Sequence, residues 1–365
     1  SRGRVSGTPL AGPADMSDAR LVAPGLTVFV TRRTVCRFYL LRPDHELTEA
    51  FLYCLAVAAE KFGIVVHTGC LMSTHMHLVF TDPRGVYPDF LQYLNRILAN
   101  VTKVLRGWGH EVFDAAGPSV VILRTPEAVV DKCAYTIANP VACGAVKSHR
   151  DWPGFFTRVE DMGKLRRIVR RPARYFSPTG EMPETAELRI EFCEMLVETH
   201  GEAASRRLVA DALEAQEKAA RAEVRARGHA FLGARRVRKA SPYKRAKAYE
   251  VFGALDPNWA TKGGGKEAYL EEAERYRTFQ ADYRRAWDRW ASGDRDVIFR
   301  RPRRRRRGPS RARPGGPGPP RDRAPARDSS SLSPGTGRGA APQHPEPSPG
   351  EAPPRVDRGN QPQPN

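Results

Sequence analysis

Apolar residues in the first half of the chain follow two different periods. Apolar residues recur at helical spacing in three segments, at 46–62, 87–105 and 127–138. Gly63 and Gly107 follow the first two helices as stops, and the third is expected to end before Asn139-Pro140. Short runs rich in β-branched and aromatic residues predict strands at 26–32, 37–41, 64–72, 75–81 and 119–123.

The order of these elements favours the α+β class. Strands and helices alternate in hairpin-sized units, which predicts a ferredoxin-like antiparallel sheet with helices on one face. This core is expected to span residues 25–155.

The second half of the chain has a different composition. Residues 156–183 are expected to form a linker, and 184–300 a mainly helical basic region with a break near Gly201. Residues 301–365 are rich in Arg and Pro and contain no aromatic residue, so we expect a disordered tail. Residues 1–24 are expected to be a disordered leader, of which 1–15 precede the first Met and are left out of the fold.

Charge narrows the class of partner. The formal net charge of +19 is typical of a protein that binds nucleic acid.

The six cysteines form no CxxC pair, so neither a zinc ribbon nor a disulfide framework is predicted. No apolar stretch approaches the roughly 20 residues of a membrane span, and no secretory signal is recognisable. We therefore expect a cytoplasmic protein that associates with the nucleoid when it is bound to DNA.

His75-Met76-His77 begins an apolar strand. Side chains alternate between the faces of a strand, so both imidazoles are predicted on one face, as half of a metal site. The alternative is that the two histidines decorate an open sheet face. His67 on the preceding strand could orient a ligand, but a packed histidine with one hydrogen bond is the favoured interpretation.

Tyr135 and Asn139 are four residues apart on the third predicted helix. Residues at this spacing share a helix face, so a phenol and an amide oxygen point the same way. The alternative is a buried tyrosine near a helix end that an Asn-Pro pair terminates.

Taken together, the two motifs resemble a known superfamily. HMHLVF and AYTIANPVACGAV, with VTRR before them and DWPG after them, resemble the HUH superfamily of single-strand DNA transposases. The resemblance is greatest to the insertion-sequence two-hundred family and its REP-associated tyrosine transposase relatives. Two details depart from the family pattern: Ser73-Thr74 replaces the usual Pro-Asn, and Val141-Ala142-Cys143 lacks a basic residue.

The resemblance implies a metal-dependent tyrosine transposase. It implies that His75, His77 and Asn139 bind Mg²⁺ or Mn²⁺ and that Tyr135 is the nucleophile. The reaction would nick and transfer single-stranded DNA through a 5′-phosphotyrosine intermediate. The implied partner is single-stranded or hairpin DNA, and the chain could act as a homodimer.

Several cations are candidates for contact with the DNA. Arg or Lys residues interleaved with aromatics suit phosphate contacts and base stacking, whereas a solvated charged surface explains them equally well. The candidates are Arg32, Arg33, Arg235, Arg236, Lys239 and Lys244.

Two other functions compete with the transposase. The first is a non-catalytic single-stranded or hairpin DNA-binding protein derived from the same fold. The second is a replication initiator or relaxase, which is disfavoured because the chain has no Gly-rich phosphate loop for a helicase.

Overall fold

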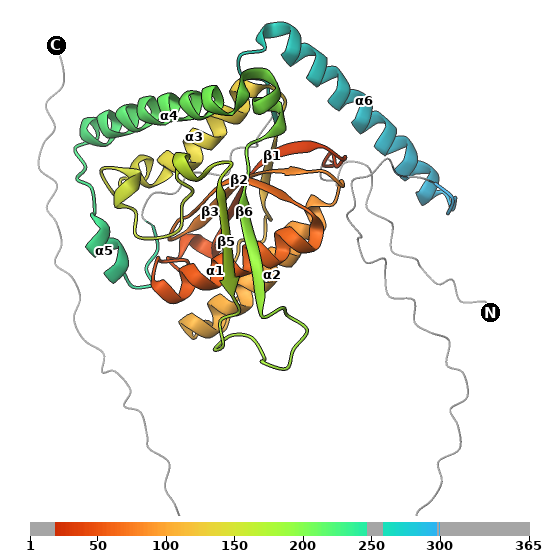
Figure 1. The fold of residues 1–365 in the computed structure, drawn as a ribbon. Helices are drawn as coiled ribbons and strands as arrows, with labels where there is room; N and C mark the ends of the chain where they lie inside the picture. The colour runs from red at the N-terminus through yellow and green to blue at the C-terminus, as the bar shows by residue number, and fades with distance from the viewer. Residues whose placement is uncertain (1–18, 247–257, 298, 300–365) are drawn as a thin grey trace, which may run out of the picture. The chain divides into compact units, whose positions relative to one another are not determined.

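A five-stranded sheet forms the framework of the chain (Figure 1). The computed structural model describes residues 19–246, 258–297 and 299. Four strands pair antiparallel in the order β2-β3-β1-β4, and β7 pairs parallel to β4 at the edge, so the sheet is mixed. The strands are β1 (Leu26–Arg33), β2 (Val65–Leu71), β3 (His75–Asp82), β4 (Ser119–Leu123) and β7 (Trp259–Ala260).

Two helices pack against one face of this sheet. They are α1 (His45–Phe62) and α2 (Tyr87–Arg106). Phe90 of α2 packs against Phe80 of β3, with ring centroids 5.1 Å apart, and Phe62 of α1 packs on Phe90. The α+β class and the first two helices are thus as the apolar pattern predicts.

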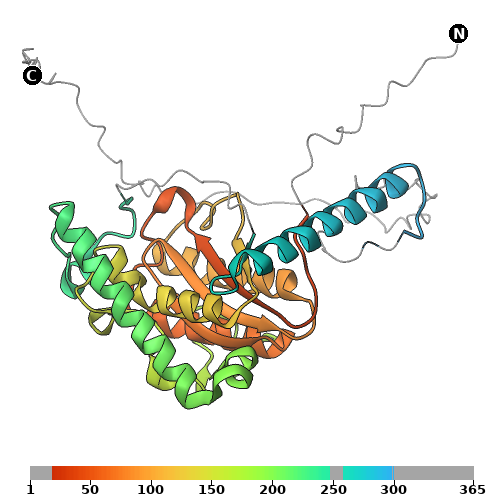
Figure 2. The same ribbon diagram turned by 90° about the horizontal axis from the view of Figure 1, so that it is seen from above.

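The third helix, α3 (Pro126–Ala142), lies on the opposite face. Asn139 of α3 contacts His75 of β3, and His75 and Phe80 point to opposite sides of the strand because side chains alternate. The expectation that all helices share one face therefore holds for α1 and α2 but not for α3. The long helix α4 (Glu194–Ala226) lies alongside α3 (Figure 2).

Helix α3 also runs further than predicted. It continues through Pro140 to Ala142 instead of ending before Asn139. Proline lacks the N–H that would bond the carbonyl oxygen of Thr136, so one helical hydrogen bond is lost. The backbone carbonyl of Pro140 still accepts bonds from Ala145 and Val146, which close the last turn. As a result Asn139 lies inside the helix, one turn beyond Tyr135.

The segment predicted as a strand at 37–41 is not one. A single 3-10 turn covers Val35–Arg37, and Cys36 and Arg37 have φ values of 46° and 55°. Left-handed φ values break the extended conformation that a strand needs. The apolar side chains of this segment are buried in the core instead, and Leu40 and Leu41 are fully enclosed.

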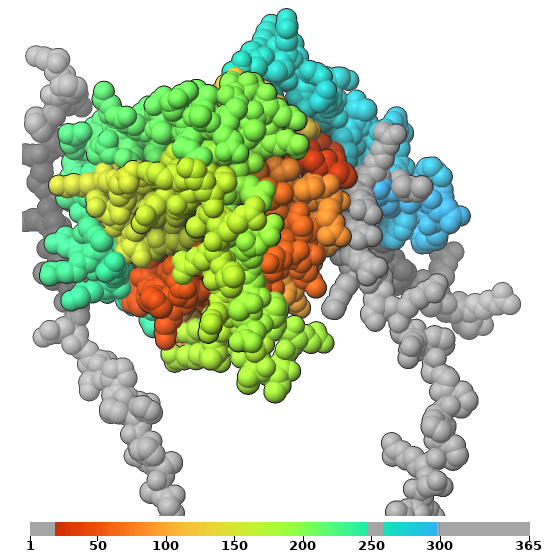
Figure 3. Space-filling view, in the orientation of Figure 1, coloured from red at the N-terminus to blue at the C-terminus, as the bar shows by residue number. Residues whose placement is uncertain are grey.

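Residues 156–183, expected to be a linker, contain a strand. β5 (Leu165–Arg170) pairs antiparallel with β6 (Thr185–Ile190) to form a separate hairpin. The apolar residues Ala186, Leu188 and Ile190 of β6 are buried at every second position, and β6 packs against α1. Figure 3 shows the β5–β6 hairpin and α4 forming much of one surface of the molecule.

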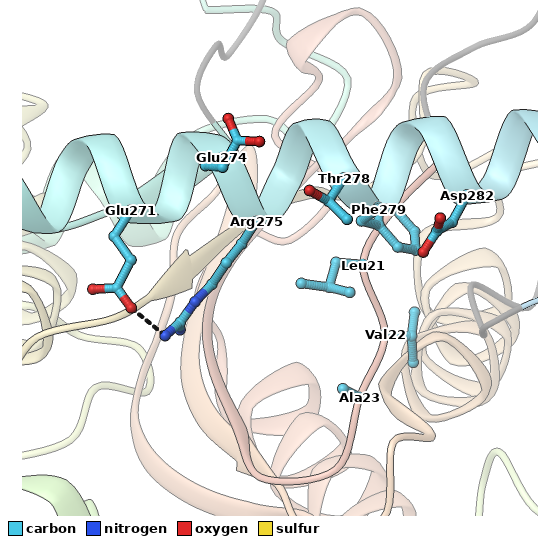
Figure 4. A pocket seen from close by; sticks show the side chains of 9 residues that line it. All are labelled: Leu21, Val22, Ala23, Glu271, Glu274, Arg275, Thr278, Phe279 and Asp282. Carbon is cyan, nitrogen blue, oxygen red and sulfur yellow. Dashed lines mark hydrogen bonds and ion pairs between the residues drawn. The ribbon is translucent and has the colours of Figure 1, made fainter.

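The described residues after 190 are largely helical, whereas 185–190, which fall in the region expected to be mainly helical, form β6. α4 is interrupted at Gly201, whose φ of 73° is the expected break. It is followed by α5 (Ala234–Lys239) and α6 (Gly265–Ala291). Beside α6, residues 21–23 leave an open hollow of about 630 Å³, shown in Figure 4.

The disordered leader predicted at 1–24 is wrong for residues 19–24, where Val22 is buried and the carbonyl oxygen of Leu21 accepts a hydrogen bond from the hydroxyl of Tyr87. The rest of the leader, 1–18, and the tail predicted at 301–365 lie outside the described residues. Among the helices that the structure describes, none has an apolar stretch long enough to cross a bilayer.

Candidate metal and nucleophile site

Two histidines of β3 face the same side of the sheet, beneath α3. His75 pairs across the sheet with Arg33 of β1, and His77 pairs with Thr31. The two imidazole rings have centroids 4.6 Å apart, and both side chains are buried. The alternation that HMH implies therefore brings both rings into one place.

A hydroxyl lies beside the Nδ1 atom of each imidazole. Thr74 Oγ1 is 2.9 Å from Nδ1 of His75, and Thr31 Oγ1 is 2.9 Å from Nδ1 of His77. These contacts hold each ring so that its Nε2 atom points away from the threonine.

The two Nε2 atoms have different surroundings. Nε2 of His75 lies 3.0 Å from Oδ1 of Asn139. Nε2 of His77 is buried and has no hydrogen-bond partner among the described residues. A buried polar atom without a partner costs free energy, on the order of 1–3 kcal/mol, which a bound ion or water at this position would recover.

Burial keeps both imidazoles neutral. Desolvation lowers the pKa of His75 to about 4, although the hydrogen bond that His75 donates to Oδ1 of Asn139 raises it. Burial lowers the pKa of His77 well below its usual value, and the nearby His75 and Arg33 lower it further. Both rings are uncharged at neutral pH, which is the form of histidine that binds a metal ion.

Tyr135 lies beside His77 at the edge of this site. The ring centroids of Tyr135 and His77 are 5.4 Å apart, and the rings meet edge to face. Phe29 contacts both rings, at 5.8 Å and 5.2 Å. Tyr135 is 37% exposed, so a large substrate can reach it from outside.

A cation from the same helix accompanies the phenol. Lys132 Nζ lies 5.4 Å from the ring centroid of Tyr135 and 3.2 Å from a carboxylate oxygen of Asp131. Lys132, Tyr135 and Asn139 are three and four residues apart, so they share one face of α3.

The side chains present fit a divalent cation. Two neutral imidazole nitrogens and one amide oxygen converge, and such mixed N and O donors suit Mn²⁺ or Mg²⁺ with further oxygen ligands. No cluster of three or more His, Cys, Asp or Glu ligands exists in the part of the chain that the structure describes. The candidate set differs from such clusters because its third donor is an amide.

His67 belongs to the core rather than to this site. Its Nδ1 lies 2.9 Å from the carbonyl oxygen of Glu191, and its Nε2 lies 2.8 Å from Thr81 Oγ1. His67 is packed, as the favoured interpretation expects, but with partners at both ring nitrogens instead of one.

The two candidate arginines of β1 point in opposite directions. Arg33 is on the face of the histidines, whereas Arg32 pairs with Met76 on the other face. Arg32 donates to the carbonyl oxygen of Asp114 at 2.8 Å and lies over the ring of Phe113. Of the two, only Arg33 is near the candidate site.

The four remaining candidate cations lie on one segment, residues 232–245, which we name the basic strap. Leu232 and Gly233 donate backbone hydrogen bonds to the residues that follow α3, and Val237 is buried in the same small apolar cluster as Cys70 of β2. Cys70 is the register partner of His77, so the strap passes beside the candidate site. Its four candidate cations are exposed: Arg235, Arg236, Lys239 and Lys244.

Three residues of the site were not expected from the sequence. Thr31 and Thr74 contact the histidines only because of strand register and a tight turn, which no local pattern reveals. Lys132 could have been predicted from the sequence, because it lies three residues before Tyr135 and therefore on the same face of the predicted helix.

Comparisons with known proteins give a distant likeness. No protein-family model and no curated protein sequence matches the chain. Among solved structures, the chain is similar to one described as a REP-associated tyrosine transposase bound to a REP hairpin. The identity is 20%, the match covers 40% of this chain and 85% of that chain, and the TM-score is 0.34. At these values the likeness assigns neither a family nor an activity to this chain.

Proposed function

We propose that this chain is a metal-dependent transposase that nicks and transfers single-stranded DNA, with Tyr135 as its nucleophile. The observation that supports this most is the buried Nε2 atom of His77, which lacks a hydrogen-bond partner among the described residues, beside the His75–Asn139 pair and the ring of Tyr135. Other buried polar atoms of the described residues also lack a partner, but only this one lies beside a second imidazole, an amide oxygen and a phenol ring, where a bound ion would satisfy it.

His75, His77 and Asn139 are the proposed metal ligands. Their neutral imidazoles need lose no proton to bind an ion, and the threonine hydroxyls hold the rings in orientation. A bound Mg²⁺ or Mn²⁺ would neutralise charge on the scissile phosphate and align it for attack.

The proposed reaction is a transesterification. The phenolic oxygen of Tyr135 forms a bond to phosphorus while the bond from phosphorus to the 3′-oxygen breaks. The phenol loses its proton and the departing 3′-oxygen gains one, leaving a 5′-phosphotyrosine and a free 3′-hydroxyl. A second 3′-hydroxyl then attacks the phosphotyrosine, which rejoins the strand and needs no ATP.

The cations around the site suit a DNA strand. Arg33 lies on the face of the histidines, and Lys132 lies beside the phenol, where a positive charge favours the phenolate. The basic strap extends this positive surface past the end of α3. These groups would hold phosphates on either side of the scissile bond.

The direct test is formation of a covalent adduct. The full chain is incubated with Mn²⁺ and end-labelled single-stranded oligonucleotides that carry hairpins, and the products are separated on denaturing gels. The proposal predicts an adduct that requires the metal and disappears in Tyr135→Phe. Tyr283→Phe, which removes a tyrosine hydroxyl from the distant helix α6, is the matched control and should retain the adduct.

A non-catalytic DNA-binding protein gives a different result. It would bind the same oligonucleotides with equal affinity with and without chelator, and His77→Ala would not change that affinity. An adduct that survives Tyr135→Phe would refute the role assigned to this residue.

A further inference from the structure

A concave surface separate from the candidate metal site lies at the turn that follows β1. Three segments far apart in the sequence form it: the turn at Val35–Arg37, the loop at 107–111 after α2, and the end of the basic strap. The hollow is about 710 Å³. The residues that line it include Phe38, Trp108, His110, Glu111 and Arg245.

Aromatic rings dominate this surface. The ring of Trp108 lies 4.9 Å from that of Phe38 and 5.6 Å from that of His110. Tyr243 of the strap approaches Trp108 from another side, at 5.9 Å, and its hydroxyl donates to the carbonyl oxygen of Arg106. Trp108 and Phe38 are only half-buried, and Tyr243 and His110 are exposed, so the rings are available to a ligand.

The polar groups around the rings have a distinct arrangement. Arg245 is exposed, and its guanidinium lies 4.4 Å from the centroid of Phe38. Lys244 is exposed next to it on the strap. Glu111 also lines the hollow, with its carboxylate 3.9 Å from Nζ of Lys103. A phosphate suits the cations, and an N–H donor of a base, such as N3–H of thymine, suits the carboxylate.

The hollow is connected to the candidate metal site by a short chain of contacts. Oγ1 of Thr34 lies 2.6 Å from the carbonyl oxygen of Phe38 and 3.0 Å from that of Thr74. Thr74 in turn holds the imidazole of His75. The turn between the two places is strained, because Cys36 and Arg37 have left-handed φ values that cost non-glycine residues free energy.

We propose that this aromatic hollow binds one unpaired base of the DNA strand whose phosphate reaches Tyr135. The proposal rests on the proposed function for the identity of the strand. Aromatic stacking holds any base by its face, and the adjacent cations hold the backbone, which is how single strands are commonly bound. The hollow would thus fix the distance between an unpaired base and the scissile phosphate.

The test measures binding in the presence of chelator, so that no cleavage is needed. Affinities of the full chain are measured by fluorescence anisotropy for labelled oligothymidylate and for an abasic strand of equal length and charge. Trp108→Leu should weaken binding of oligothymidylate by on the order of tenfold and leave binding of the abasic strand unchanged. Trp108→Phe should restore most of the loss.

Two further variants separate the base from the backbone. Arg245→Gln should weaken both strands, because a phosphate contact does not depend on the base. Trp290→Leu, at a partly exposed tryptophan of α6, is the matched control and should weaken neither.

Photocrosslinking of the unaltered chain does not depend on how the variants fold. An oligonucleotide with 5-iododeoxyuridine should crosslink to peptides that contain Trp108 or Tyr243. Crosslinks confined to other peptides, or equal losses for both strands in Trp108→Leu, would overturn the proposal. The proposed function fails separately, by the absence of a Tyr135 adduct with Mn²⁺.

Discussion

At the scale of single residues, the candidate site depends on two threonines as much as on its histidines. Thr31 fixes the ring of His77 through Nδ1, and Thr74 does the same for His75. Without such a partner an imidazole can rotate or change its tautomer, and its remaining nitrogen is then no longer aimed at the ion.

We predict that Thr31→Val weakens Mn²⁺ binding by about 10- to 100-fold. Valine keeps the volume of the side chain but removes the hydroxyl, whereas Thr31→Ser keeps the hydroxyl and should retain near-normal affinity. Isothermal titration calorimetry with Mn²⁺ measures both variants. Equal affinities for Val and Ser would show that the hydroxyl does not orient a ligand.

Lys132 gives a prediction about pH. Its ammonium group lies 5.4 Å from the ring centroid of Tyr135, and a nearby positive charge favours a phenolate. In Lys132→Met we expect the pH at which adduct formation is half-maximal to rise by up to about one unit. Lys132→Arg keeps the charge and serves as the control; a profile that stays fixed in Lys132→Met would remove the lysine from the mechanism.

The residue patterns of the site were largely readable from the sequence. A His-x-His triplet on a strand and a Tyr-x-x-x-Asn spacing on a helix each fix one shared face, because both periods are local. That the strand face and the helix face meet is a tertiary contact, which only the resemblance to HUH transposases suggested. The sequence could also have shown that Arg32 and Arg33 point to opposite faces of the sheet, since neighbouring residues on a strand alternate.

At the scale of elements, α3 carries the site and α4 holds α3 in place. A buried hydrogen-bonded pair links α4 to the turn that follows α3: Oε1 of Glu217 lies 2.8 Å from Nδ1 of His149 and accepts the backbone N–H of His149 at 2.7 Å. Arg221 pairs with the other oxygen at 3.0 Å. Burial alone would raise the pKa of Glu217, but these hydrogen bonds lower it from 4.5 to about 2.

This network should make the free energy of unfolding fall as the pH becomes acidic. The pKa of Glu217 is lower in the folded chain than in the unfolded chain, so its contribution is complete above about pH 4.5 and is lost as the pH falls toward 2. We expect Glu217→Gln to lower the melting temperature at neutral pH and to flatten its decline in acid. Glu214→Gln, at an exposed position of the same helix, is the control. Parallel melting curves for Glu217→Gln and the unaltered chain across this range would contradict the assignment.

The predictions for three segments were wrong, each for a different physical reason. The segment at 185–190 alternates buried and exposed residues, but its Ala, Glu, Leu and Arg content favours a helix, and pairing with β5 overrides that propensity. Residues 37–41 have strand composition, but two left-handed residues turn the chain. Helix α3 passes Pro140 because packing around it outweighs the lost hydrogen bond.

At the scale of the whole molecule, positive charge is spread beyond the site. The residues after Arg306, which lie outside the described residues, carry more Arg than Asp and Glu. Added cations strengthen attraction to any DNA and steepen its salt dependence.

We therefore predict that a chain truncated after Arg306 keeps its melting temperature but binds single-stranded DNA more weakly. The slope of log affinity against log salt concentration should be shallower, because fewer counterions are released. Anisotropy titrations at several salt concentrations measure this slope. An unchanged slope would show that the residues after Arg306 do not contact DNA.

The whole account depends on Tyr135 forming a covalent bond to DNA next to the two histidines. The most direct measurement is tandem mass spectrometry of the protease-digested product from a reaction with Mn²⁺ and single-stranded DNA. The account predicts a peptide that carries a nucleotide 5′-phosphate on Tyr135 and that is missing when His77 is replaced by alanine. A nucleotide attached to another residue, or an equal yield from His77→Ala, would contradict it.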